Sequence, residues 1–148
     1  MTATQPTQTP FRVLVPLSEN EESARAQARF ISSLPDAPQN VEATLTHVFH
    51  GEELGLSRQL RQTQRIGTVS HVKKDLLTKG ISVQVMDSSD PYPPTKSILT
   101  LADTIDADLI VLGGGMHGLL DDLLTGNVAK SVGRRTNRPI AVVPATVT

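Results

Sequence analysis

The residues best suited to chemistry lie in the last third of the chain, where a run of glycines separates two apolar segments. Asp108–Leu112 and Ile140–Val143 have the length and aliphatic content of buried strands. Between them we expect a helix that begins at Gly126 and Asn127. A strand that leads through glycines to a helix N-terminus brings together unpaired N–H groups and the positive end of the helix dipole, so the stretch predicts a site for a phosphate-sized anion. The glycines of the cluster are Gly113, Gly114, Gly115 and Gly118.

The same cluster satisfies the dinucleotide pattern G-x-G-x-x-G from Gly113 to Gly118. That pattern belongs to the first strand-to-helix turn of its fold and requires an acid about 20 residues downstream. Here Arg138 stands at about that distance, and only one strand follows. The sequence therefore disfavours a nicotinamide or flavin site.

Three further polar residues share the glycine-rich loop. Asp121 and Asp122 would repel a polyphosphate unless a divalent cation lay between them, and a cation needs more ligands than these two. A solvated turn is therefore favoured over a metal site. His117 could donate to a phosphate, but an exposed loop position is the favoured interpretation.

The remaining histidines do not predict a metal centre. His47 falls in an expected strand, and His50 and His71 are scattered, whereas a metal site needs three or four converging ligands. We interpret all three as ordinary surface or core residues.

Four basic residues cluster near the end of the chain without predicting a binding patch. They fall in or just after the helix that begins at Gly126, where positive charge complements the C-terminal end of the dipole. These residues are Lys130, Arg134, Arg135 and Arg138.

No catalytic constellation is present. Ser18 follows an expected strand but has no adjacent base, and no Ser/His/Asp set or carboxylate pair can be placed. The sequence predicts a protein that is not an enzyme.

Apolar periodicity places these residues on alternating strands and helices. Ser18 offers an N-cap for a first helix that ends before Pro35 and Pro38, with Glu21 at the capping-box spacing. Gly80 suits the residue just after a long second helix. The expected strands are Phe11–Leu17, Val41–Phe49, Ile81–Met86, Asp108–Leu112 and Ile140–Val143, and the expected helices run from about Ser18 to Leu34, Ser57 to Lys79, Lys96 to Ile105, and onward from Gly126.

This alternation predicts an α/β fold with one doubly wound, five-stranded parallel sheet, because right-handed crossovers join neighbouring parallel strands. Ligands of such sheets lie beyond the carboxyl ends of the strands, where the strand order reverses. Strands one and four flank that point, and their ends carry Ser18 and Gly113.

Composition narrows the function classes. The chain has 148 residues, which suits one domain, at residues 11–148, after a polar tail at residues 1–10. A net charge of −1, a pI near 6.4 and few aromatic residues argue against nucleic-acid binding. The absence of cysteine and of any long apolar run predicts a cytoplasmic protein without a membrane span.

Several motifs together resemble the universal stress protein family over about residues 11–144. These are VLVPL in the first strand, THV in the second, the DP-containing loop, ADLIVLG, LLTGNVAKSV and the terminal RPIAVVP. The resemblance implies a Rossmann-like fold of the adenine nucleotide alpha hydrolase type with strand order 3-2-1-4-5. It also implies a homodimer formed through Ile140–Val143, an apolar strand that would otherwise be an unprotected edge.

Nucleotide-binding members of that family carry a loop of the form G-x2-G-x9-G-[ST] and an aspartate after the first strand. In this chain Gly113 and Gly126 match, whereas Met116, Asn127 and Ser18 replace the second glycine, the hydroxyl residue and the aspartate. Met116 resists close backbone approach because it has a Cβ atom. The nucleotide site that the resemblance implies comprises Leu17, Ser18, Val48, Gly113, Gly115, Gly126, Asn127 and Val128.

Three functions follow from the resemblance and its departures. The first is a regulatory protein of the stress response in which binding of ATP or another adenine nucleotide is weak or lost. The second is an ATP-binding protein that acts as a nucleotide-dependent switch. The third, and least favoured, is a nucleotide-hydrolysing enzyme, for which the sequence lacks a base and a metal set.

Overall fold

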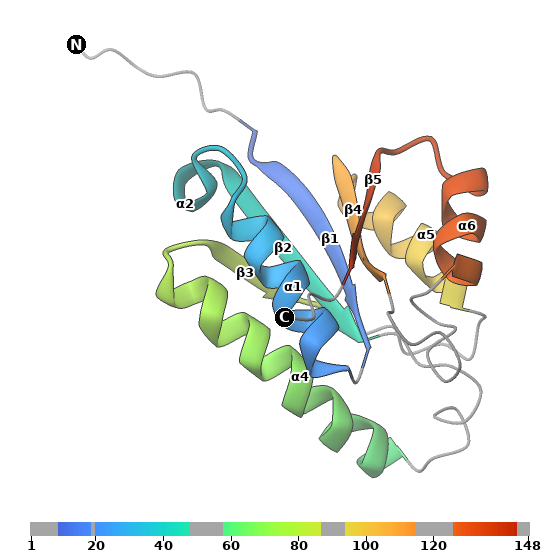
Figure 1. The fold of residues 1–148 in the computed structure, drawn as a ribbon, viewed down its shortest axis with the longest axis horizontal. Coiled ribbons are helices and arrows are strands. Elements are labelled where there is room, and N and C mark those ends of the chain that lie inside the picture. The colour runs from blue at the N-terminus through green and yellow to red at the C-terminus, as the bar shows by residue number, and fades with distance from the viewer. Residues whose placement is uncertain (1–8, 19, 48–57, 87–93, 115–125, 145–148) are drawn as a thin grey trace.

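Five parallel strands form one sheet with helices on both faces (Figure 1). The computed structural model describes residues 9–18, 20–47, 58–86, 94–114 and 126–144. The strand order is β3-β2-β1-β4-β5, which confirms the predicted topology. The strands are β1 (Phe11–Leu17), β2 (Val41–His47), β3 (Ser82–Val85), β4 (Leu109–Gly114) and β5 (Ile140–Pro144). The helices are α1 (Glu21–Ser32), α2 (Ala37–Asn40), α4 (Arg58–Thr78), α5 (Pro94–Ile105) and α6 (Gly126–Arg135).

The predicted elements agree with these bounds to within a few residues. The second strand ends at His47, and the rest of its expected range, including Phe49, lies outside the described residues. None of the described helices combines the length and apolarity that a membrane span needs.

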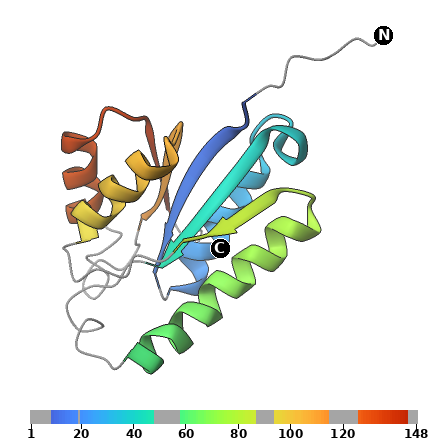
Figure 2. The same cartoon turned by 180° about the vertical axis from the view of Figure 1, so that it is seen from behind.

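The central strand β1 divides the core into two layers. Val13, Val15 and Leu17 pack beneath α1 and α4, whereas Leu14 packs against α5 and α6 on the other side of the sheet. Figures 1 and 2 view the sheet from these two sides. All four side chains are fully buried. Burial on both faces explains why β1 is an almost continuous apolar run instead of an alternating one.

The N-cap of α1 is Asn20, so the predicted cap at Ser18 is wrong. The Asn20 side chain accepts a hydrogen bond of 3.0 Å from the Ser23 N–H group. Ser18 stays buried beyond the end of β1, where its hydroxyl oxygen accepts a 3.1 Å hydrogen bond from the Asn20 N–H group. Both residue types are good N-caps, and the end of the strand decides which one takes the position.

The two prolines expected to follow the first helix have different roles. α1 ends at Ser32, and Pro38 occupies the first turn of the short helix α2. Proline is tolerated there because its missing N–H group would have had no partner within the helix. The prediction that the first helix ends before both prolines is confirmed.

The last strand is less buried than its composition predicts. β5 lies at the edge of the sheet, and Val142 is 47% exposed. Its neighbour β4 pairs with it from Ile110–Ile140 to Gly114–Pro144, and no strand of the described chain covers its other edge.

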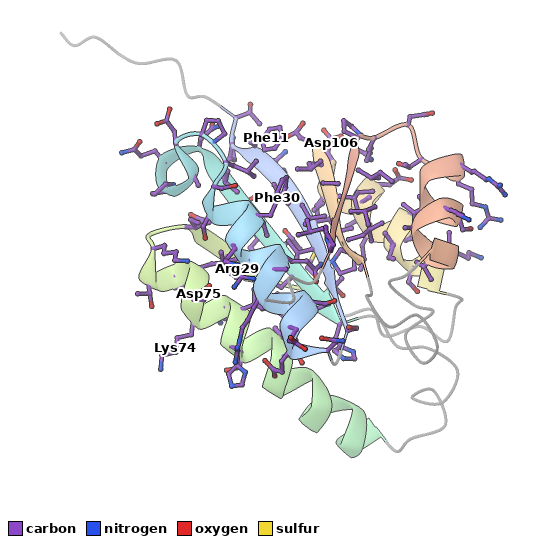
Figure 3. The ribbon with its side chains drawn as sticks, in the orientation of Figure 1. Phe11, Arg29, Phe30, Lys74, Asp75 and Asp106 are labelled. Carbon is purple, nitrogen blue, oxygen red and sulfur yellow. The ribbon has the colours of Figure 1, made fainter. Side chains whose placement is uncertain are left out.

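Arg138 joins two turns that are distant in sequence, so its interpretation as a partner of the helix dipole was incomplete. Its guanidinium contacts Asp103 and Asp106 at 3.1 Å each and donates a 2.7 Å hydrogen bond to the Ala107 carbonyl oxygen. The hydrogen bonds to Asp106 and then to Asp103 raise the pKa of Arg138 above its ordinary value. Figure 3 places Asp106 at the end of the sheet where β4 begins, opposite the carboxyl ends of the strands.

Gly80 ends α4 as predicted. Its φ angle is +82°, and the bonds from Gly80 N–H to Leu77 O (2.9 Å) and from Ile81 N–H to Leu76 O (3.0 Å) form a Schellman motif. Leu76 and Ile81 are both buried, so the motif carries its usual hydrophobic contact.

We expect Gly80→Ala to lower the free energy of unfolding by about 1–2 kcal/mol, because a Cβ atom is strained at positive φ. Gly67→Ala is the matched control. Gly67 lies within α4, and an added Cβ would meet no atom of the described residues within 4 Å, so alanine there should raise stability by up to about 1 kcal/mol. Urea denaturation followed by circular dichroism measures both. Equal effects of the two variants would contradict the assigned helix end.

Candidate functional site

The carboxyl ends of β1 and β4 flank the point where the strand order reverses, as predicted, and β2 lies on the other side of β1. β1 pairs with β2 along its full length, from Phe11–Val41 to Leu17–His47. Its register with β4 covers only Val13–Leu109 and Leu14–Ile110. Past those pairs, no ladder pair joins the two strands in the described chain. We call Pro16–Ser18 and Val111–Gly113 together the β1–β4 gap.

Gly113 lies within β4, opposite Val143 of β5, and not at the start of a loop as predicted. Its α-carbon faces α1. A Cβ atom there would lie 3.0 Å from Gln27 Oε1 and 3.3 Å from both Ser23 Cβ and Ser23 Oγ. Any other residue at this position would push the Gln27 and Ser23 side chains away by a few tenths of an ångström, so glycine suits the close approach of α1 to the sheet.

Two buried polar side chains of α1, Ser23 and Gln27, were missed by the sequence analysis. Both are fully buried, and they lie on the same helix face as Ile31, at successive four-residue steps. Polar residues at positions that continue an apolar stripe are the signal that could have revealed them. The predicted apolar positions on this helix, Ala24, Ala28 and Ile31, are buried as expected.

The N-termini of α1, which follows β1, and of α6, which follows β4, differ in charge. α1 carries Glu21 and Glu22 in its first turn, which opposes the binding of an anion there. α6 begins at Gly126 as predicted and has no acidic residue in its first turn. Val128, in that turn, packs against the core layer of α5 and α6. Among these two helices, α6 offers the more favourable end for an anion.

The structure describes only part of the predicted site. Leu17 and Ser18 lie at the end of β1, Gly113 lies in β4, and Gly126, Asn127 and Val128 begin α6. The predicted contacts Val48 and Gly115 lie outside the described residues. The loop residues Met116, His117, Asp121 and Asp122 also lie outside them.

The end of β2 contributes further buried polar groups. Thr46 and His47 are fully buried, and the Thr46 hydroxyl oxygen has no hydrogen-bond partner among the described residues.

His71 is exposed, and its Nδ1 lies 3.0 Å from Glu21 Oε1. The described residues include no group of three potential ligands able to hold a metal ion.

A separate hollow of about 490 Å³ lies between α1 and α4 and contains none of the predicted site residues. Ala24, Ala28 and Val72 line it together with charged side chains, including Arg29 and Asp75, which Figure 3 labels. Its acids are engaged, since Glu21 contacts His71 and Asp75 contacts Lys79 at 3.5 Å. Opposing charges along this groove do not favour one class of ligand.

The family assignment rests on a match over nearly the whole chain. The model of the universal stress protein family matches residues 11–144. The chain belongs to the universal stress protein family. A search of curated proteins finds no match.

Solved structures of universal stress proteins share the fold at low sequence identity. One from Archaeoglobus fulgidus in complex with dAMP is 20% identical, with a TM-score of 0.70 over 90% of this chain and 97% of the other. One in complex with cAMP is 20% identical, with a TM-score of 0.63 over 94% and 100%. One from Arabidopsis thaliana with AMP bound is 14% identical, with a TM-score of 0.68 over 93% and 94%.

We expect Gly113→Ala to destabilise this universal stress protein by about 1–3 kcal/mol without any ligand, because the added methyl group would overlap Gln27 and Ser23. Gly133→Ala in α6 is the control. Among the described residues its Cβ would meet the terminal methyl group of Ile140 at 3.2 Å, and this crowding opposes the helix propensity that alanine adds, so the net change should stay within about 0.5 kcal/mol. Thermal and urea unfolding measure both. An unchanged Gly113→Ala protein would show that α1 does not constrain this glycine.

Proposed function

We propose that this chain is a regulatory protein of the stress response that binds an adenine nucleotide weakly and does not turn it over. The observation that carries the proposal is the acid-free N-terminus of α6, which follows β4 at the reversal of strand order. Relatives of the same fold are complexed with AMP, dAMP or cAMP. A phosphate at Gly126 would meet backbone N–H groups and a favourable dipole.

Two contacts at the gap support weak affinity. The Ser18 oxygen already accepts a hydrogen bond from the Asn20 N–H group, and Ser18 carries no charge where family members have an aspartate. Gln27 and Ser23 of α1 cover one side of the Gly113 α-carbon, so a ligand could contact Gly113 only through its peptide N–H and C=O groups. The proposal places the protein in the cytoplasm, consistent with its lack of cysteine.

The surroundings of Ser18 support a non-catalytic role. Within the described part of the chain its hydroxyl oxygen accepts a hydrogen bond from a backbone N–H group, which cannot activate a hydroxyl as a base would. A nucleotide bound here would act by shifting the stability of the folded state and the position of the strand ends.

We expect millimolar AMP, or ATP with magnesium, to raise the melting temperature of the wild type by about 1–2 °C and that of a Ser18→Asp, Met116→Gly, Asn127→Ser variant by about 5 °C or more. The variant restores the family pattern. A ligand at a hundredfold excess over its dissociation constant stabilises by about 2.7 kcal/mol, which corresponds to several degrees in a domain of this size.

Differential scanning fluorimetry measures these shifts, with GMP as the matched control for recognition of adenine. Phosphate release with magnesium tests turnover in the same samples. An absent shift in the triple variant, an equal shift with GMP, or steady phosphate release would each contradict the proposal.

We also propose that the protein forms a homodimer through β5. This edge strand is wholly aliphatic before Pro144, and Val142 is exposed on it. An apolar edge strand exposes unpaired backbone groups and invites pairing with another chain. The opposite edge strand, β3, is shorter and alternates polar Ser82 and Gln84 with valines, so it is the less suitable interface.

We expect Val142→Lys to convert the dimer to a monomer, because a lysine in an apolar interface would lose its hydration or keep the strands apart. Val85→Lys is the matched control, since Val85 is 42% exposed on the opposite edge. Sedimentation velocity measures the mass of each variant. A monomeric wild type, or a dimer lost only in Val85→Lys, would exclude β5 as the interface.

A further inference from the structure

The side chain of Gln27 bridges the β1–β4 gap. It is fully buried, and its Nε2 donates hydrogen bonds to the Pro16 carbonyl oxygen at 2.9 Å and to the Val111 carbonyl oxygen at 3.0 Å. One amide nitrogen thus bonds to both strands just past the last ladder pair, Leu14–Ile110. The two carbonyl oxygens can therefore be no more than about 6 Å apart.

Pro16 makes this arrangement compatible with a central strand. Proline has no N–H group and would remove a ladder hydrogen bond inside a sheet. In an extended strand the N–H and C=O groups of one residue point to the same side, and the Pro16 carbonyl points to the gap. The missing N–H group therefore falls where no ladder forms, and the Gln27 amide satisfies the carbonyl.

The oxygen atom of the Gln27 side-chain amide, Oε1, also lies against β4. Both strand carbonyls can only accept, so the nitrogen must face them and Oε1 must face away. Oε1 lies against the α-carbon of Gly113, beside the hydroxyl of Ser23. Neither Gln27 Oε1 nor Ser23 Oγ has a hydrogen-bond partner among the described residues. Gln27 thus touches β4 at both Val111 and Gly113, and β1 at Pro16.

We propose that Gln27 is a positioning residue of the ligand site, which sets the separation between the ends of β1 and β4 and thereby the affinity for nucleotide. This inference rests on the proposed function. β1 leads to Ser18 and β4 leads through Gly114 toward α6, so the two strands carry the two halves of the site. Gln27 acts on the ligand only through these strands.

Gln27→Met tests the role, because methionine keeps the length and unbranched shape of the side chain but removes both donated hydrogen bonds. Ile31→Val is the matched control. Ile31 is equally buried one turn further along α1 and makes no hydrogen bond to either strand through its side chain. Amide hydrogen exchange by mass spectrometry is measured for both variants without ligand, with residues 68–78 of α4 as the reference segment.

We expect Gln27→Met to accelerate exchange about tenfold at the amides of Leu17 and Ser18 and of Val111–Gly114, and to leave α4 unchanged. A purely structural role would accelerate all three segments together and would overturn the proposal. If Gln27→Met does not fold, Gly113→Ala displaces the same amide from the other strand. It should then accelerate exchange at the Leu17 and Ser18 amides, which it does not alter directly.

Calorimetric titration with AMP completes the test in the wild type and in the triple variant that restores the family pattern. We expect Gln27→Met to weaken AMP binding at least fivefold in whichever background binds, and Ile31→Val to leave it within twofold, about the error of such comparisons. Unchanged affinity in Gln27→Met overturns the positioning role alone. An absence of binding in both backgrounds overturns the proposed function and, with it, any ligand role of Gln27.

Discussion

A strand buried on both faces must satisfy its backbone hydrogen-bonding groups entirely within the protein. β1 is such a strand, because helices cover both of its faces and the side chains of Val13, Leu14, Val15 and Leu17 are inaccessible to water. On the β2 side a complete ladder meets this requirement. On the β4 side the ladder covers only two residue pairs, and the amide of Gln27 supplies the next hydrogen bonds. A side chain of α1 thus completes the sheet at the reversal of strand order, where open α/β sheets in general bind ligands.

The need for hydrogen bonds beyond the end of the β1–β4 ladder gives one reason for buried polar residues near the strand ends. Ser23, Gln27 and Thr46 are as inaccessible as the aliphatic core, yet they lie around the carboxyl ends of β1, β2 and β4. Polar groups are costly to bury, so their concentration beside the reversal of strand order needs a compensating role. Gln27 has one in the hydrogen bonds it donates to both strands. Where β1 and β4 lose their ladder, the buried amide of Gln27 supplies the missing hydrogen bonds.

The sequence predicted the order of the strands because alternating elements and right-handed crossovers allow few topologies. It failed where neighbouring residues compete for one role or where partners are distant. Ser18 and Asn20 are both good N-caps, and only the end of β1 selects Asn20. The sequence pattern assigned Arg138 to the negative C-terminal end of the α6 dipole, but its partners Asp103 and Asp106 lie more than 30 residues earlier. Local patterns contain no information on such pairs.

The glycine motif also hides a contact between residues that are distant in sequence, and this contact affects how the function is inferred. A glycine in a phosphate-loop pattern is usually interpreted as room for a ligand, yet the missing side chain of Gly113 makes room for Gln27 and Ser23 of α1. Loss of nucleotide binding would leave this requirement intact, because the helix would still need the space. Gly113 can therefore persist for packing in a chain where the second glycine and the aspartate of the family pattern have been replaced by Met116 and Ser18. A residue of a partial motif is therefore evidence of ligand binding only where no packing contact explains that residue.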